Sequence, residues 1–248
     1  MTSIRIAPHL NGLVNAAQGG IASGLFARIV GGTARVRLMK PVPLDVDLDV
    51  REGRGGAAAI EHDGSVIATV EPTAPFRHDA PLTPTYADAL EAAQRHPLHG
   101  VRHPFAECVV CSPTRPGGLG VVFGTSRLLP DVLIAPLSAS APFVADGALR
   151  PEMLWGALDC VSFPADLLPS RTVAVTGQLT AHIERAVAAD ERLVVVGWQT
   201  GTGNRSHRTA SVVLDEAGRV VASGDMTWVE FASPTATATA TALVQSVV

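Results

Sequence analysis

The sequence predicts an α+β protein built from two copies of one unit, each with a central helix and a curved antiparallel sheet. Three observations predict this fold class: a faint internal repeat, apolar residues that alternate around glycine turns, and a short, almost entirely apolar helix in each half. A lone helix that is apolar nearly all round must be buried on most faces, so a sheet has to wrap it. The 248 residues, 47% of them hydrophobic, suffice for one large domain or two smaller ones.

The internal repeat rests on identities at one constant offset. Residues of an apolar stretch recur later in the chain with the same spacing: Val42, Asp45, Leu48 and Val50 against Val187, Asp190, Leu193 and Val195. Downstream, the turn Asp63-Gly64 and the strand 66–68 correspond to Ala217-Gly218 and the strand 220–222. Alternation of period two around a two-residue glycine turn is typical of antiparallel hairpins. Each copy is therefore expected to contain a helix followed by several strands.

One buried helix is predicted in each copy. The first begins at Gly19-Gly20 and ends at Gly31-Gly32, so glycines bound it on both sides. The second begins at Pro151, a residue suited to the first helical turn, and runs to Pro164. A third, more polar helix is predicted over residues 85–94.

The composition of the chain changes between the two copies. We expect a first domain over residues 1–95, a linker loop rich in Pro, His, Gly and Cys over 96–120, and a second domain over 121–232. Residues 233–248 are a low-complexity tail of repeated Ala and Thr, in which 242–248 are able to add an edge strand.

Charge and cysteine usage narrow the function classes. The net charge of -4 argues against a nucleic acid or an anionic membrane as the main partner. The N-terminus lacks a signal-peptide core, and the three cysteines form an odd set, so we expect a cytoplasmic protein. No stretch is apolar enough to predict a membrane span.

The order of these elements resembles the double hotdog fold of acyl-CoA thioesterases, most closely the acyl-CoA thioesterase II type. In the first half, Gln18-Gly19-Gly20 followed by residues 21–24 resembles the Gly-Gly helix start of that family, and Met39-Lys40-Pro41 resembles its strand with a basic residue before proline. The resemblance implies two hotdog domains whose helices lie side by side, with a site between them, and an acyl-CoA or other acyl thioester as substrate. It also implies a possible homo-oligomer and no cofactor.

The resemblance also implies site residues in the second half. Asp159 falls where the family carries a helical aspartate, and Thr176 falls where it places a threonine. The third polar residue of the family is a glutamine on the last strand, and the matching position here is Met226. This departure means that Gln178 or Thr227 has to compensate, or that a different polar set is used.

The residues themselves support part of this chemistry. Thioester hydrolysis needs a group that activates water and a positive field at the developing oxyanion. The free N–H groups of a helix that opens on Gly19 and Gly20 supply such a field, although these glycines also suit a simple turn. Asp159 has no basic residue at helical spacing, so burial would raise its pKa and make it a base. The alternative is an exposed stripe or a distant arginine partner.

Our hypothesis is a single composite site. Aligning Pro151 with Gly19 matches Asp159 to Ala27, so one copy has the glycines and the other has the carboxylate. Asp159 would activate water or attack directly, while the Gly19 or Gly20 N–H polarises the carbonyl. Four further residues are assigned to substrate contacts: Gln18, Trp155, Ser162 and Met226.

Two other functions stay open. A hotdog protein that binds acyl-CoA or acyl chains without hydrolysis is favoured by Met226. A hydratase is less consistent, since no Asp-x-Asn-x-x-His pattern lies near either helix.

The pair Cys108 and Cys111 follows three histidines in the linker. Zinc and a redox pair are both conceivable, but the second cysteine pair of a zinc ribbon is missing and the spacing of His96, His99 and His103 is irregular. We therefore favour a structural loop and expect no metal. Arginines are expected to meet the phosphates of coenzyme A, and three are candidates that the sequence does not rank: Arg28, Arg150 and Arg205.

Overall fold

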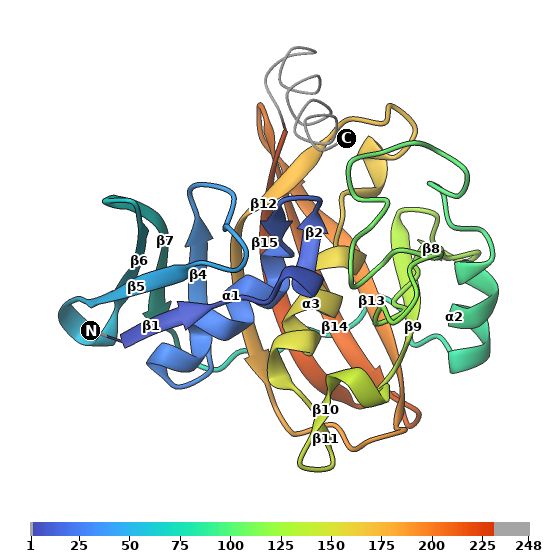
Figure 1. Cartoon of the computed structure of the whole chain (residues 1–248). Helices are drawn as coiled ribbons and strands as arrows, with labels where there is room; N and C mark the ends of the chain where they lie inside the picture. Colours follow the sequence, from blue (N-terminus) through green and yellow to red (C-terminus); the bar gives the residue numbers. More distant parts are fainter. Residues whose placement is uncertain (1, 231–248) are drawn as a thin grey trace.

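The computed structural model describes residues 2–230 and contains one large antiparallel sheet of eleven strands, with two helices packed side by side against it (Figure 1). The order of strands in the sheet is β1-β5-β6-β7-β4-β12-β15-β14-β13-β9-β8. The strands of the first copy are β1 (Thr2–Arg5), β4 (Ala34–Leu38), β5 (Asp47–Glu52), β6 (Ala58–His62) and β7 (Ser65–Pro72). Those of the second are β8 (Gly124–Thr125), β9 (Val132–Ser138), β12 (Ala174–Ile183), β13 (Arg192–Thr202), β14 (Ser206–Asp215) and β15 (Val220–Glu230).

Smaller elements complete the chain. Two short hairpins stand apart from the main sheet: β2 (Asn11–Leu13) with β3 (Ala16–Ala17), and β10 (Val144–Ala145) with β11 (Ala148–Leu149). Single 3-10 turns occupy Pro8–Leu10, Arg28–Val30, Arg54–Gly56, Ala141–Phe143 and Ala165–Leu167. None of the helices between residues 2 and 230 is both long and apolar enough to cross a membrane.

The two copies have the same topology in mirrored order. Read outward from the middle of the sheet, the first copy runs β4-β7-β6-β5-β1 and the second runs β12-β15-β14-β13-β9. Corresponding strands of the two copies therefore lie at the same distance from the middle of the sheet. The copies join where β4 pairs antiparallel with β12, with Ala34 opposite Ala181 and Arg37 opposite Gln178. The predicted pair of repeated α+β units is confirmed, and their sheets are continuous.

The two central helices begin where the sequence predicts. Helix α1 (Gly19–Ala27) is followed by a 3-10 turn that ends at Gly31. The φ angle of Gly31 is 94°, a left-handed conformation that favours glycine because it has no Cβ. Helix α3 (Pro151–Val161) has its proline in the first turn and stops before the predicted end at Pro164. Both helices are buried along almost their whole length, as apolar helices inside a sheet must be.

Glycines let these helices approach closely. A Cβ on Gly20 would lie 2.4 Å from the Trp155 carbonyl oxygen, and one on Gly24 would lie 2.7 Å from the Glu152 Cα. On the other side of the crossing, a Cβ on Gly156 would lie 2.9 Å from the Ile21 side chain. The glycines of α1 therefore set the distance between the copies, a role that the sequence analysis did not consider.

The segment between the copies packs against the second one. Helix α2 (Tyr86–Ala93), predicted over 85–94, starts at a capping box between Thr85 and Asp88. Its Ala89 and Ala92 pack on the face of the second sheet that points away from α3. The range 1–95, predicted as a first domain, thus includes a helix that covers the second copy. This helix packs there because the outer face of the second sheet is apolar and has to be buried.

The predicted linker 96–120 is irregular but partly buried. Val109 and Val110 are in the core, and the Val109 N–H donates to the Asn11 carbonyl. This loop therefore packs against the core and is part of the folded structure. The low-complexity tail 233–248, including the edge strand considered at 242–248, lies outside the described residues.

Candidate active site

Asp159 lies at the interface of the two helices and is only 3% exposed. Its Oδ2 accepts hydrogen bonds from Gln18 Nε2 at 2.6 Å and from the Gly20 N–H at 3.0 Å, both in the first copy. Its Oδ1 accepts from Thr176 Oγ1 at 2.5 Å. The structure thus brings together four residues that the sequence analysis selected, and it draws them from both copies.

The hydrogen bonds leave one part of the carboxylate free for further contacts. Each carboxylate oxygen offers about two lone pairs. Oδ2 has two donors from the protein, whereas Oδ1 has one, so Oδ1 retains a lone pair that is able to accept from a water molecule. Asp159 also lines a cavity between the two copies and the loop that connects them.

Burial raises the pKa of the Asp159 carboxyl to about 7, because the charged form loses its hydration. The hydrogen bonds from Thr176, Gly20 and Gln18 act in the opposite direction, since they stabilise the anion. The Cys108 thiol group adds a smaller raising effect. A carboxyl balanced in this way is able to both accept and return a proton near neutral pH.

Gln18 has two functions at this site. It is the N-cap residue of α1, and its Oε1 accepts from the Ile21 N–H at 2.6 Å. This bond directs Nε2 toward Asp159. Helix capping in one copy therefore orients a donor toward the carboxylate of the other copy.

The two predicted glycines differ in their surroundings. The Gly20 N–H is used by Asp159, and Gly20 does not line the cavity. Gly19 does line it, and a Cβ there would lie 3.3 Å from Thr176 Oγ1. Gly19 is the first residue of α1, so its N–H has no acceptor within the helix. The hypothesis that either glycine polarises a carbonyl therefore narrows to Gly19.

The cavity has a volume of about 620 Å³ and mostly apolar walls. Its apolar lining includes Leu38, Val42, Phe105, Phe123, Phe163, Leu168, Val175 and Trp228. Three exposed cations also line it: Lys40, Arg102 and Arg171. Within residues 2–230 none of these cations has an acidic partner, in contrast to Arg150, which lies 3.3 Å from Glu152.

Other residues selected from the sequence lie elsewhere. Trp155 packs at the helix crossing, and Met226 is buried without reaching the cavity. Ser162 donates to the Asp159 carbonyl oxygen at 2.8 Å and accepts from Trp228 Nε1 at 3.2 Å, so it supports the end of α3. These three residues were expected to contact substrate, and none of them lines the cavity, because helix packing and strand direction turn them into the core.

The structure shows which residue lies where the family glutamine was expected beside Asp159. Gln178 and Thr227 pair with each other and lie opposite the exposed Arg37 and Arg208, so they face away from α3 and do not compensate for Met226. Gln18, from the first copy, holds the place beside Asp159 instead.

Sequence reasoning missed the cavity cations. Arg28, Arg150 and Arg205 do not line the cavity, and Arg205 donates to the Glu230 carbonyl oxygen at 2.8 Å. A signal was present for Lys40, which belongs to the block Met39-Lys40-Pro41. The other two cations come from irregular segments, where spacing predicts nothing about direction.

Comparison with solved structures identifies the fold. A conserved protein of unknown function with a hotdog fold from Alicyclobacillus acidocaldarius matches 93% of this chain and 92% of its own, with 13% identity and a TM-score of 0.51. The chain has the hotdog fold, in the double form expected from the sequence.

Shorter matches also occur. A thioesterase superfamily protein matches 49% of this chain with 20% identity and a TM-score of 0.44, and this chain spans only 59% of that structure. A hypothetical thioesterase from Streptococcus pneumoniae, solved with coenzyme A, matches 41% of this chain and 79% of its own, with 16% identity and a TM-score of 0.38. No protein-family description and no curated protein matches the sequence.

Proposed function

We propose that this protein hydrolyses acyl thioesters, with Asp159 as the base that activates water. The observation that carries the proposal is the position of this carboxylate: it is buried between the copies, it accepts hydrogen bonds from three donors, and it lines an apolar cavity. A buried carboxylate without a cationic partner lowers the stability of the fold, so its presence indicates a chemical role.

The cavity supports an acyl-CoA as the preferred substrate class. Its apolar walls suit a hydrocarbon chain, and the three free cations at its exposed edge suit the phosphates of a carrier. The family resemblance of the sequence implies the same substrate.

The reaction follows from the placement of the groups. A water molecule donates a hydrogen bond to Asp159 Oδ1, and the carboxylate takes its proton as the oxygen attacks the thioester carbonyl. The Gly19 N–H, at the positive end of α1, stabilises the resulting oxyanion. The C–S bond then breaks, and the proton returns from Asp159 to the leaving thiolate. Thr176 positions the carboxylate throughout.

Hydrolysis is tested with a panel of acyl-CoAs of increasing chain length, following free thiol. We expect Asp159→Asn to lower the turnover number about 10²- to 10⁴-fold, the usual contribution of a general base. The exposed Asp131→Asn is the matched control and is expected to be as active as the wild type.

A non-hydrolytic acyl-CoA binder gives a different result. In that case calorimetry would detect acyl-CoA binding to the wild type while no thiol is released at any chain length. Hydrolysis by Asp159→Asn at the wild-type rate would equally contradict the proposal.

A further inference from the structure

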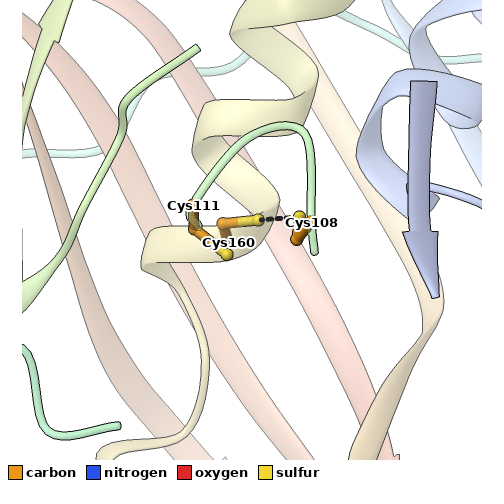
Figure 2. Close-up of side chains that lie close together, drawn as sticks. All are labelled: Cys108, Cys111 and Cys160. Carbon is orange, nitrogen blue, oxygen red and sulfur yellow. Dashed lines mark hydrogen bonds between the residues drawn. The ribbon is translucent and has the colours of Figure 1, made fainter. Parts of the chain in front are cut away.

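All three cysteines of the chain meet at one point of the cavity wall (Figure 2). Cys108 and Cys111 lie on the loop between the copies, and Cys160 lies on α3. Their sulfur atoms are all within 4.8 Å of one another, and the Cys108 and Cys160 sulfurs are 3.8 Å apart. The proposed reaction uses none of them.

The sulfur separations are compatible with a shared metal ion. Four thiolates around Zn²⁺ at about 2.3 Å in a tetrahedron are roughly 3.8 Å apart. The Cys108–Cys160 distance has this value, and the Cys111 sulfur lies within 4.8 Å of both other sulfurs. A disulfide would use two of the sulfurs and leave the third without a role, whereas a metal ion uses all three.

The surroundings leave room for a fourth ligand. All three cysteines line the cavity, although Cys108 and Cys160 are also part of the hydrophobic core. His103 lines the same cavity and interacts electrostatically with Cys108. Its Nδ1 is buried and has no hydrogen-bond partner among residues 2–230. Three protein ligands and an accessible fourth position are a common arrangement around Zn²⁺.

The chemical nature of the three side chains decides which ion they hold. Thiolates select soft or borderline cations over Mg²⁺ or Ca²⁺.

We propose that Cys108, Cys111 and Cys160 together bind one Zn²⁺ ion at the wall of the cavity. The ion fastens the loop 96–120 to α3, beside the catalytic carboxylate. Gln18 Nε2 links the two sites, since it donates to Asp159 Oδ2 and lies 3.5 Å from Cys160 Sγ. This site is independent of whether the protein hydrolyses thioesters.

The test uses the full chain, stripped of metal by a chelator and kept reduced by a phosphine. Titration with Co²⁺ is expected to give one equivalent of binding, with thiolate-to-cobalt charge-transfer bands and the visible bands of tetrahedral cobalt. Zn²⁺ should abolish these bands by displacement. Because loss of an outer-shell partner already weakens metal binding 10- to 100-fold, Cys111→Ser should weaken it on the order of 100-fold or more. Ser112→Ala, the neighbouring control, should bind as the wild type does.

A second measurement does not depend on any variant. Zn²⁺ should protect all three thiols of the wild type from a maleimide, counted by mass spectrometry, and a chelator should restore their reaction. The proposal is overturned if reduced wild-type protein takes up less than one equivalent of Co²⁺, or if the thiols react equally fast with and without Zn²⁺. A disulfide in the purified protein, with no metal uptake after its reduction, overturns it as well.

Discussion

The Gly20 N–H of the first copy donates a hydrogen bond to Asp159 Oδ2 of the second copy across 3.0 Å. This contact exists because the two helices cross at glycines, which leave no Cβ between the backbones. The catalytic carboxylate proposed here is thus positioned by the other copy. Neither copy contains the whole arrangement, since Ala27 occupies the place in α1 that corresponds to Asp159.

Gly20→Ala tests the helix crossing. Alanine is normally favoured over glycine inside a helix by up to about 1 kcal/mol. Here the added Cβ would lie 2.4 Å from the Trp155 carbonyl oxygen, so the helices must separate. We expect the free energy of unfolding, measured by chemical denaturation, to fall by about 1–3 kcal/mol.

Ser23→Ala is the control in the same helix. The Ser23 hydroxyl is buried and finds no hydrogen-bond partner among the described residues, so its removal should not destabilise the fold. A Gly20→Ala protein as stable as this control would contradict the close crossing.

Gly19→Pro tests the proposed oxyanion donor. Proline suits the first helical position, and Gln18 already has the extended backbone, with φ -64° and ψ 129°, that precedes proline. The substitution removes one N–H and should lower the turnover number about 10²- to 10³-fold. Gly19→Ala adds the same Cβ but keeps the N–H, so it is the matched control. Equal turnover in the two variants would remove Gly19 from the mechanism.

Thr176→Val tests the role of the third hydrogen bond at Asp159. This bond lowers the pKa of the carboxyl, so its loss should raise the pKa further above the value of about 7. The ascending limb of the pH–rate profile should shift to higher pH, with measurements made in a chelator to exclude metal effects. Thr180→Val, on the opposite face of the same strand, should leave the profile in place. A Thr176→Val profile that coincides with the control would mean that the bond is only structural.

The stability of the protein should depend on pH through Asp159. The pKa of this carboxyl is raised in the folded state above its unfolded value near 4, so its contribution is present below about pH 4 and is lost as pH rises through 7. We expect a loss of up to roughly 4 kcal/mol between pH 4 and 8. Denaturation curves of Asp159→Asn should lack this loss. Parallel pH dependence in the two proteins would show that the carboxyl titrates normally.

Lys40→Ala tests the carrier. Because Lys40 is exposed at the cavity and unpaired, its contact with a phosphate should be modest, and KM for acyl-CoA should rise roughly 3- to 10-fold. KM for the N-acetylcysteamine thioester of the same acyl group, which has no phosphate, should not change. Arg28→Ala removes an exposed positive charge away from the cavity and serves as control. A rise in KM for both thioesters would argue against phosphate recognition.

Local signals in the sequence predicted much of this structure. The apolar stretches bounded by glycine or proline gave α1 and α3, and the polar stretch ahead of the linker gave α2. The turns at Asp63-Gly64 and Ala217-Gly218 lie in the predicted hairpins. In each case the signal and the element occupy the same short segment.

What could not be predicted depends on how distant segments meet. Gln18 was assigned to substrate, but only the helix crossing shows that its amide is used by Asp159. The spacing of Cys108 and Cys111 favoured a plain loop because the third sulfur comes from a residue far along the chain. Whether the Met226 side chain lines the cavity or is buried in the core likewise depends on the direction of its strand, and here it is buried in the core.

The pairing of β4 with β12 places both copies on one polypeptide, and this has an evolutionary consequence. In a symmetric homodimer every substitution appears twice, so both helices would carry the glycines and the acid, and two equal sites would form. A fused pair is free of that constraint. The counterpart of the site has accordingly lost both groups, since Pro151 stands for Gly19 and Ala27 for Asp159.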